Sequence, residues 1–199
     1  MLNRREDRLV PVLALIDPLR GIEMLREVFG FEDHGDGQLS YGDLTVVVRD
    51  AMRPHTDLLA LRMDHLALRV PDIAAMGMDF PAKLGKSTPD GPREISEFWT
   101  SGVRFVFFDG PEKWPIEFCM RLDGSVIDHG LDHFGIRTPD VGLMANKLAG
   151  LGAEPVAHHR LGAVDVQFMK RTGQMFEIFD EMPFEASHPL QGWVGFLST

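Results

Sequence analysis

The chain has 199 residues, of which 44% are hydrophobic, enough to bury a sizeable core as one compact unit or as two small ones. Its net charge of −10 would repel a phosphate backbone, and no basic run offsets it, so nucleic acid is excluded as a partner. No apolar stretch approaches the ~20 residues that span a bilayer, and the N-terminal MLNRREDRLV lacks the apolar core of a signal peptide. We therefore expect no membrane partner and a cytoplasmic location. Its single cysteine, Cys119, excludes an internal disulfide and a Cys-based zinc cage.

Residues 1–60 predict a small N-terminal unit. The segment VLALIDPLRG (12–21) has the pattern of a strand that leads into a helix, and the apolar stripe that follows ends at Gly30. QLSYG (38–42) and LTVVVR (44–49) then predict a hairpin. This unit therefore has the elements of a strand–helix–strands module.

A nine-residue segment occurs twice in the rest of the chain. DHLALRVPD at 64–72 returns as DHFGIRTPD at 132–140, and each copy begins Asp-His and ends Pro-Asp. An internal repeat of this kind indicates that one structural unit is used more than once. The repeat divides the rest of the chain into two modules and a C-terminal tail: 61–125, 126–182 and 183–199.

The two copies place equivalent polar side chains on one face of a strand. Apolar and polar residues alternate in each copy, the period of a strand whose two faces differ. His65 and Arg69 share a face in the first copy, and His133 and Arg137 share the matching face in the second. We therefore expect a histidine and an arginine on each of two equivalent strand faces.

Each copy is followed by a predicted helix and three strands. The helix after the second copy has Thr138 as N-cap, Pro139 at its first position and Gly150 at its close. The helix after the first copy is interrupted by Pro81, so we expect it to end near Asp79. The strands are predicted, in chain order, at 93–99, 102–108, 115–121, 154–158, 163–169 and 174–180.

One carboxylate lies in the last predicted strand of each repeated module. Glu117 stands in PIEFCMR and Glu177 in MFEIFDE, where a lone buried carboxylate would be costly. Two neutral imidazoles and two carboxylates suit a divalent ion such as Zn, Ni, Co, Mn or Fe(II). The pattern predicts one metal site of His65, Glu117, His133 and Glu177. The alternative is that the histidines are ordinary core or surface residues and the glutamates face solvent on edge strands.

The strand–helix–three-strand module with His first and Glu last resembles the vicinal oxygen chelate superfamily, which includes glyoxalases, bleomycin resistance proteins and extradiol dioxygenases. The resemblance covers residues 63–182 and, more weakly, 9–50, and the ligand order His, Glu, His, Glu is similar to that of glyoxalase I. It implies an α+β fold in which tandem βαβββ modules form a cup-shaped mixed sheet with helices on its outer face. In the degenerate first module, Val12 and Thr45 stand at the ligand positions.

The predicted site and the resemblance together favour a metal-dependent enzyme with a small-molecule substrate. A glyoxalase-type lyase or isomerase would transfer a proton on a small α-oxygenated substrate through a metal-stabilised enediolate. Glu177 is the expected base, with Glu117 on the opposite face. Arg69 and Arg137 are candidates for binding a substrate carboxylate or phosphate, with salt bridges to acidic neighbours as the alternative. The other functions considered are an Fe(II)-dependent extradiol-type dioxygenase and a metal-free protein that binds a small molecule such as an antibiotic.

We also expect a homodimer, because an odd number of modules leaves the first with an unpaired sheet edge and an uncovered apolar face. The apolar tail GWVGFL (192–197) is a candidate for docking on the neighbour, with a frayed terminus as the alternative. Three further histidines, His129 and the pair His158 and His159, are predicted in exposed turns, and Cys119 is predicted to be a small buried residue.

Overall fold

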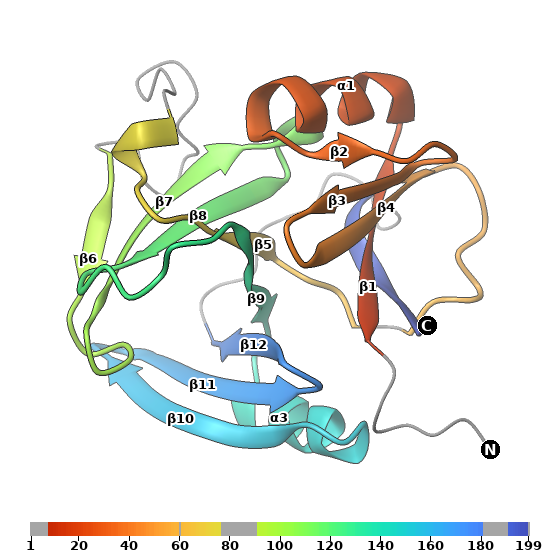
Figure 1. Ribbon diagram of the computed structural model, residues 1–199. Coiled ribbons are helices and arrows are strands. Elements are labelled where there is room, and N and C mark those ends of the chain that lie inside the picture. The colour runs from red at the N-terminus through yellow and green to blue at the C-terminus, as the bar shows by residue number, and fades with distance from the viewer. Residues whose placement is uncertain (1–7, 60, 77–90, 181–190, 199) are drawn as a thin grey trace.

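The computed structural model describes residues 8–59, 61–76, 91–180 and 191–198, which form strands and helices arranged around two β-sheets (Figure 1). The strands are β1 (Leu9–Leu15), β2 (Glu32–Asp33), β3 (Gln38–Tyr41), β4 (Leu44–Asp50), β5 (His65–Arg69), β6 (Arg93–Ile95), β7 (Val103–Asp109), β8 (Pro115–Arg121), β9 (Gly130–Arg137), β10 (Glu154–Leu161), β11 (Val164–Arg171), β12 (Gln174–Phe179) and β13 (Gly192–Ser198). The helices are α1 (Pro18–Phe29), α3 (Val141–Gly150) and the short 3-10 turns η1 (Ala74–Met76) and η2 (Pro111–Lys113). Neither α-helix in these ranges is long and apolar enough to cross a membrane.

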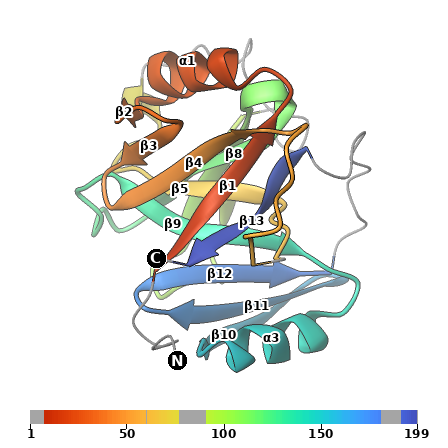
Figure 2. The same ribbon diagram turned by 90° about the vertical axis from the view of Figure 1, so that its right-hand side faces the viewer.

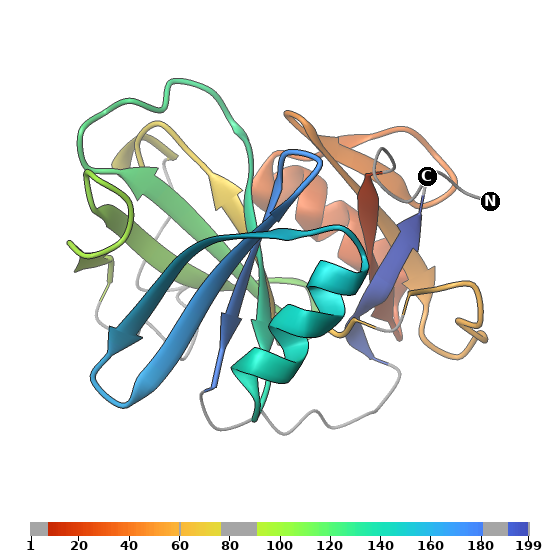
Figure 3. The same cartoon turned by 90° about the horizontal axis from the view of Figure 1, so that it is seen from below.

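The larger sheet has eight strands and is built from two units with the same internal order. Its order is β10-β11-β12-β9-β5-β8-β7-β6, and β5 pairs with β9 in antiparallel fashion at the centre. Within each unit the first strand pairs in parallel with the last, β5 with β8 and β9 with β12. The sheet curls into a cup with α3 on its outer face (Figure 3). This is the α+β arrangement of tandem modules that the sequence predicted.

The five-stranded sheet and α1 pack against the outer surface of the cup, on the other side of the molecule from α3 (Figure 2). Phe29 of α1 packs edge-on against Phe108 and Phe118, with ring centroids 6.4 and 6.1 Å apart. Phe196 of β13 packs against Phe134 of β9 at 5.0 Å. Because the apolar core lies on this convex side, the concave side of the eight-stranded sheet is left to form a cavity.

The N-terminal unit matches its predicted elements. Asp17 accepts a hydrogen bond from the backbone N–H of Arg20 at 3.1 Å and so begins α1, while Gly30 ends it in the left-handed region at φ 77°. Strand register corrects one alignment. Ala14 pairs with Arg49 as the equivalent Ala67 pairs with Glu117, so Arg49 and not Thr45 occupies the Glu117 position.

The C-terminal segment corrects the expectation that it docks on a neighbour or frays. It forms β13, which pairs in antiparallel fashion with β1 of the same chain. Trp193 and Phe196 are fully buried there, which supplies the driving force for the pairing. In the order β13-β1-β4-β3-β2, strand β13 lies beside β1 as β9 lies beside β5. The edge of β1 that was expected to be unpaired is therefore covered within the chain.

Some predicted boundaries differ from those observed. The N-cap of α3 is Asp140, which accepts from the N–H of Leu143 at 2.8 Å, so the helix begins two residues after Pro139. Strand 93–99 stops at Ile95, because the chain turns before β7 and Trp99 takes a positive φ of 58°.

Two other differences concern the middle helix and two histidines. The helix expected after Pro71 is a 3-10 turn as far as Met76, and its predicted end near Asp79 lies outside the described residues. His158 and His159 lie on β10 and not in a turn. A regular strand thus runs further than the predicted 154–158.

Candidate metal centre

The central strands of the cup bring one Glu–His pair together across a small residue. Ala67 on β5 pairs with Glu117 on β8 and, on its other side, with His133 on β9. Residues in one cross-strand row point to the same face of a sheet. Because the intervening side chain is a methyl group, the longer Glu117 and His133 side chains can meet above it.

A second row repeats this arrangement with a glycine in the middle. Gly135 on β9 pairs with His65 on β5 and with Glu177 on β12. A Cβ added at Gly135 would lie 2.0 Å from Cε1 of His65, so the imidazole occupies the space that any side chain would need. The absence of a side chain at Gly135 therefore allows the His65 imidazole to lie over strand β9.

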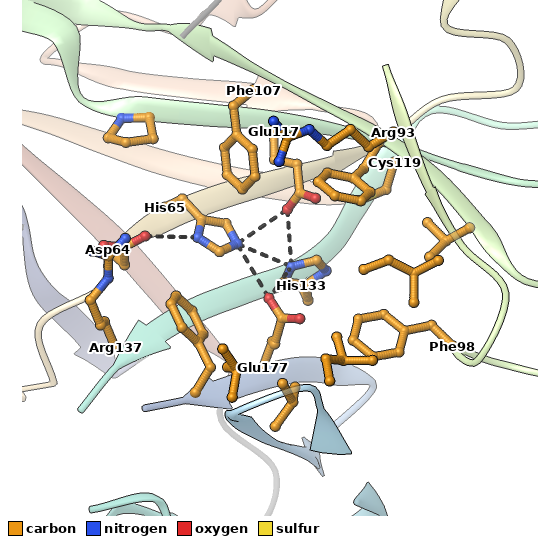
Figure 4. Close-up of a pocket in the computed structure, with 18 of the residues that line it drawn as sticks. Asp64, His65, Arg93, Phe98, Phe107, Glu117, Cys119, His133, Arg137 and Glu177 are labelled. Atoms are coloured by element: carbon orange, nitrogen blue, oxygen red, sulfur yellow. Dashed lines mark hydrogen bonds and ion pairs between the residues drawn. The ribbon is translucent and has the colours of Figure 1, made fainter. Parts of the chain in front are cut away.

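The four predicted ligands converge on one point of the inner face (Figure 4). The distances are 3.1 Å for His65 Nε2–Glu117 Oε2, 3.2 Å for His133 Nε2–Glu117 Oε2, 3.2 Å for His133 Nε2–Glu177 Oε2, 3.6 Å for His65 Nε2–Glu177 Oε2 and 3.2 Å between the two Nε2 atoms. Atoms that each lie about 2.1 Å from one ion are roughly 3.0 to 3.4 Å apart in octahedral or tetrahedral geometry. Four of the five observed separations fall in that range, and the fifth, 3.6 Å for His65 Nε2–Glu177 Oε2, lies slightly above it.

Each imidazole is held from behind by the aspartate that precedes it. Nδ1–H donates to this carboxylate, whose other oxygen pairs with an arginine, and this fixes the tautomer that leaves the Nε2 lone pair free. The distances are 3.1 Å for His65–Asp64, 2.9 Å for Asp64–Arg137, 2.9 Å for His133–Asp132 and 2.9 Å for Asp132–Arg121. Two equivalent arginine–aspartate–histidine chains therefore aim both Nε2 atoms at the same point.

The cluster suits a divalent cation better than hydrogen bonds among its own members. Glu117 Oε2 is buried and, within the described part of the chain, has no well-directed hydrogen-bond donor, although two Nε2 atoms lie within 3.2 Å of it. Lone pairs this close repel unless a positive charge lies between them. Two nitrogens and two oxygens match Zn, Ni, Co, Mn or Fe(II). His65, His133, Glu117 and Glu177 would hold the ion.

The charges in the cluster depend strongly on one another. Burial lowers the pKa of His65, but its contacts with Asp64 and the two glutamates outweigh burial and raise that pKa well above its usual value. The pKa of His133 is raised in the same way. Burial raises the pKa of Glu177, but the nearby imidazoles more than reverse this and hold it far below its usual range. A cation at the cluster would take the place of the protons on the imidazoles.

The two arginines expected to bind substrate are already engaged. Arg69 donates to the carbonyl of Leu131 at 3.0 Å, pairs with Asp128 at 3.2 Å and is not among the residues that line the cavity. Arg137 lines the cavity, but its Nε pairs with Asp64. The salt-bridge alternative therefore describes both side chains as the structure places them.

The remaining polar residues near the cluster have simpler roles. Cys119 is buried and lines the cavity, and burial, followed by the charges of Glu117 and Asp132, raises the pKa of its thiol well above the usual value. It is therefore a neutral thiol. His129 is exposed, as predicted, and bonds to the hydroxyl of Tyr41 at 2.7 Å. The supporting aspartates were overlooked in the sequence, although the Asp-His pair that opens both repeats was a signal for them.

Replacing Asp132 with asparagine tests the support of His133. We expect metal affinity to fall about 10- to 100-fold, because the amide cannot match the carboxylate in fixing the tautomer and raising the basicity of the imidazole. Competition titration with a chelating dye would measure the change. Asp128→Asn, on the segment that leads into β9 and paired with Arg69 alone among the described residues, is the matched control and should leave affinity unchanged. Equal affinities in wild type and Asp132→Asn would contradict this role.

Comparison with known proteins supports the fold. No protein-family model matches the sequence, and no curated protein sequence matches it significantly. Among solved structures, a single-residue variant of glyoxalase I from Zea mays matches with a TM-score of 0.61 at 13% identity, covering 96% of this chain and 72% of that chain. A protein from Bacillus subtilis proposed to be a dioxygenase matches with a TM-score of 0.56 at 14% identity, covering 98% of this chain and 67% of that chain. The chain has the fold of the vicinal oxygen chelate superfamily.

Proposed function

We propose that this protein is a metal-dependent lyase or isomerase of the glyoxalase type, which moves a proton on an α-oxygenated small molecule through an enediolate. The observation that carries the proposal is the convergence of His65, Glu117, His133 and Glu177 at the wall of a cavity of about 750 Å³. Cavities of a few hundred cubic ångströms or more accept small-molecule ligands. The fold match to glyoxalase I over most of this chain is consistent with such a reaction.

Each residue of the cluster has a distinct task in this proposal. A bound divalent cation would supply Lewis acidity for neighbouring substrate oxygens. Glu177, whose side chain is 14% exposed against 7% for Glu117, is the base that takes the proton from the substrate carbon and returns it to the adjacent one. In the metal-free protein the imidazoles outweigh burial and hold the pKa of Glu177 far below its usual range, and a bound cation in contact with the carboxylate would likewise make it a weak base. The carboxylate must therefore swing toward the cavity to act, while Glu117 stays as a fixed partner of both histidines.

Solvent exchange tests the reaction class. We expect metal-loaded protein in D2O to incorporate deuterium at the carbon beside the oxygenated carbon of a turned-over substrate, because the abstracted proton exchanges with solvent before it returns. A panel of α-hydroxy and α-oxo carbonyl compounds and thiol hemithioacetals, followed by NMR, would detect it. Oxygen uptake in step with product formation would overturn the proposal and favour an extradiol-type dioxygenase.

The dioxygenase is the second candidate because a fold neighbour from Bacillus subtilis is proposed to have that activity. It is less favoured here because four protein ligands leave two positions of an octahedral ion, too few for a bidentate catechol and oxygen together unless one glutamate does not contact the ion. A metal-free antibiotic-binding protein would have no use for two supported histidines, and metal analysis distinguishes it from both enzymes.

We also propose a homodimer in the cytoplasm. Strand β13 already covers the edge of β1, so the support now comes from apolar side chains at one end of the five-stranded sheet. Ile16 is 64% and Met52 74% exposed, and the pairing of Leu15 with Asp50 places them close together. Light scattering at micromolar concentration should report twice the chain mass of 22.3 kDa, and Ile16→Ser with Met52→Ser should lower it. A monomeric wild type would refute the dimer.

A further inference from the structure

The cavity beside the ligand cluster is lined mainly by aromatic and aliphatic side chains. Phe98, Phe105 and Phe168 are among them, and Phe98 packs edge-on against Phe168 with ring centroids 5.1 Å apart. These rings come from opposite halves of the cup, because β7 and β11 lie on either side of the central pair. A surface of this kind favours an apolar body in the ligand, since burying it removes both surfaces from water.

Three cationic side chains, Arg93, Lys113 and Arg137, interrupt this apolar wall, and Arg93 is the one on the edge of the β6–β7 half. Arg93 on the edge strand β6 pairs with Phe105, which pairs in turn with Cys119, so the three share one row on the inner face. All three line the cavity. In Figure 4 the Arg93 side chain comes from the same side of the view as Phe98, opposite Arg137, and its nitrogens point toward Glu117. The guanidinium therefore belongs to the wall of the cavity and not to the outer face of the sheet.

Arg93 has no acidic partner among the residues that the structure describes. Its neighbour on the other face of the sheet, Arg104, is paired with Glu94, and the cavity-lining Arg137 is paired with Asp64. Arg93 is exposed, which keeps its charge hydrated while no ligand is bound. An arginine offers a planar pair of N–H donors that match a carboxylate. The unpaired guanidinium beside aromatic rings is thus a site for an anionic group on a largely apolar ligand.

The position of Arg93 also sets the size of that ligand. Strand β6 is two strands away from β8, which carries Glu117, and two strand spacings amount to roughly 10 Å. A two- or three-carbon substrate held at the cluster would reach the guanidinium only where the long Arg93 side chain extends back toward Glu117. A molecule with a ring or a similar spacer between its two polar ends would do so.

We propose that the substrate is an amphipathic carboxylate: its neighbouring oxygens meet the four-residue cluster, its apolar body lies against the aromatic wall, and its distal carboxylate is bound by Arg93. The placement of the oxygenated end rests on the proposed function, whereas the roles of the wall and of Arg93 do not. By binding this carboxylate, Arg93 would determine the specificity of the site for acids over neutral analogues. Arg93 therefore takes the role of anchor for an anionic group that was predicted for Arg69 and Arg137.

Paired probes test this assignment by binding and not by turnover. Benzohydroxamic acid has a hydroxamate group, with two neighbouring oxygens, attached to an apolar ring. Its para-carboxy and para-carboxyethyl derivatives add a carboxylate at two different distances from that group. For zinc-loaded wild type, at least one acid should bind about threefold to tenfold tighter than its neutral amide, a modest factor because Arg93 is exposed. Titration calorimetry, or the fluorescence of the cavity-lining Trp99, would measure both.

Two variants assign the preference to a residue. Arg93→Met keeps the apolar stem but removes the charge, and the ratio of acid to amide affinity should fall to about one while benzohydroxamic acid itself binds as before. Arg104→Met removes the same charge from the outer face and should keep the wild-type ratio. Equal affinity of acids and amides for wild type, or an unchanged ratio in Arg93→Met, would overturn the proposal.

Two compounds without a metal-binding group test the Arg93 site independently of the proposed function. Phenylbutyrate and its amide lack the oxygenated end, so they report on the wall and Arg93 in protein stripped of metal. If hydroxamates fail to prefer zinc-loaded over stripped protein, the proposed function fails. Retention of the acid preference by phenylbutyrate in wild type and its loss in Arg93→Met would still support the Arg93 site, and its absence in wild type would overturn that site as well.

Discussion

Replacing His133 with alanine should abolish stoichiometric binding of a divalent cation, whereas the wild type should bind about one ion per chain. The substitution removes an Nε2 atom that lies 3.2 Å from both glutamate oxygens and leaves the two carboxylates without one of their two imidazole neighbours. Elemental analysis after reconstitution and extensive dialysis would measure the content. Circular dichroism would establish that the fold is kept.

His159→Ala is the matched control. This residue packs against Phe98 with ring centroids 5.1 Å apart but takes no part in the cluster, so metal content should not change. A wild type that binds no ion after reconstitution, or equal metal content in wild type and His133→Ala, would contradict the metal site.

The pH dependence of binding follows from the same contacts. In the metal-free protein the acidic neighbours, acting against burial, raise the pKa of both histidines well above the usual value. Protons therefore compete with the cation, and affinity should fall as pH decreases through that raised range and increase as pH rises. An affinity that is constant with pH would show that the imidazoles are not ligands.

The repeat made the cup predictable from sequence. Strand alternation and the repeat assign His65 and His133 to equivalent faces of their own strands, and an apolar strand around Glu117 or Glu177 implies a buried carboxylate. Local patterns of this kind depend on residues a few positions apart. The α1 helix, with Gly30 at its end, was predictable for the same reason.

The parts that were not predictable depend on long-range register. The C-terminal segment becomes a strand because β13 pairs with β1 and Trp193 is buried. Neither of these contacts can be recognised from the residues next to the segment in the sequence. Arg137 shares a strand face with His133 but pairs with Asp64 of the other repeat. The prediction that Arg137 binds substrate was based only on the strand face that it shares with His133. Its salt bridge depends on which residue of the neighbouring segment lies opposite, and the sequence does not show this. Arg93 was overlooked because a three-residue edge strand carries almost no periodicity.

Replacing Glu177 with glutamine should reduce proton transfer by about 100- to 10,000-fold, the usual contribution of a general base, with little loss of metal. The amide oxygen can still face His133 and a cation, but the amide cannot accept the proton from carbon. The measurement is the initial rate of deuterium incorporation, together with metal content on the same sample. Loss of rate with retained metal would show that the lost rate comes from the missing proton acceptor at Glu177 and not from loss of the ion.

Glu117→Gln is the informative comparison, because both glutamates contact the same two Nε2 atoms. Glu117 is the more buried and lies in the row of Ala67, so its amide has less freedom to turn toward the cavity. We expect this variant to lose metal affinity more than Glu177→Gln and to keep more of its rate per bound ion. The reverse pattern would exchange the roles of the two residues, with Glu117 as the base, and comparable rates per ion in both variants and in wild type would remove both from proton transfer.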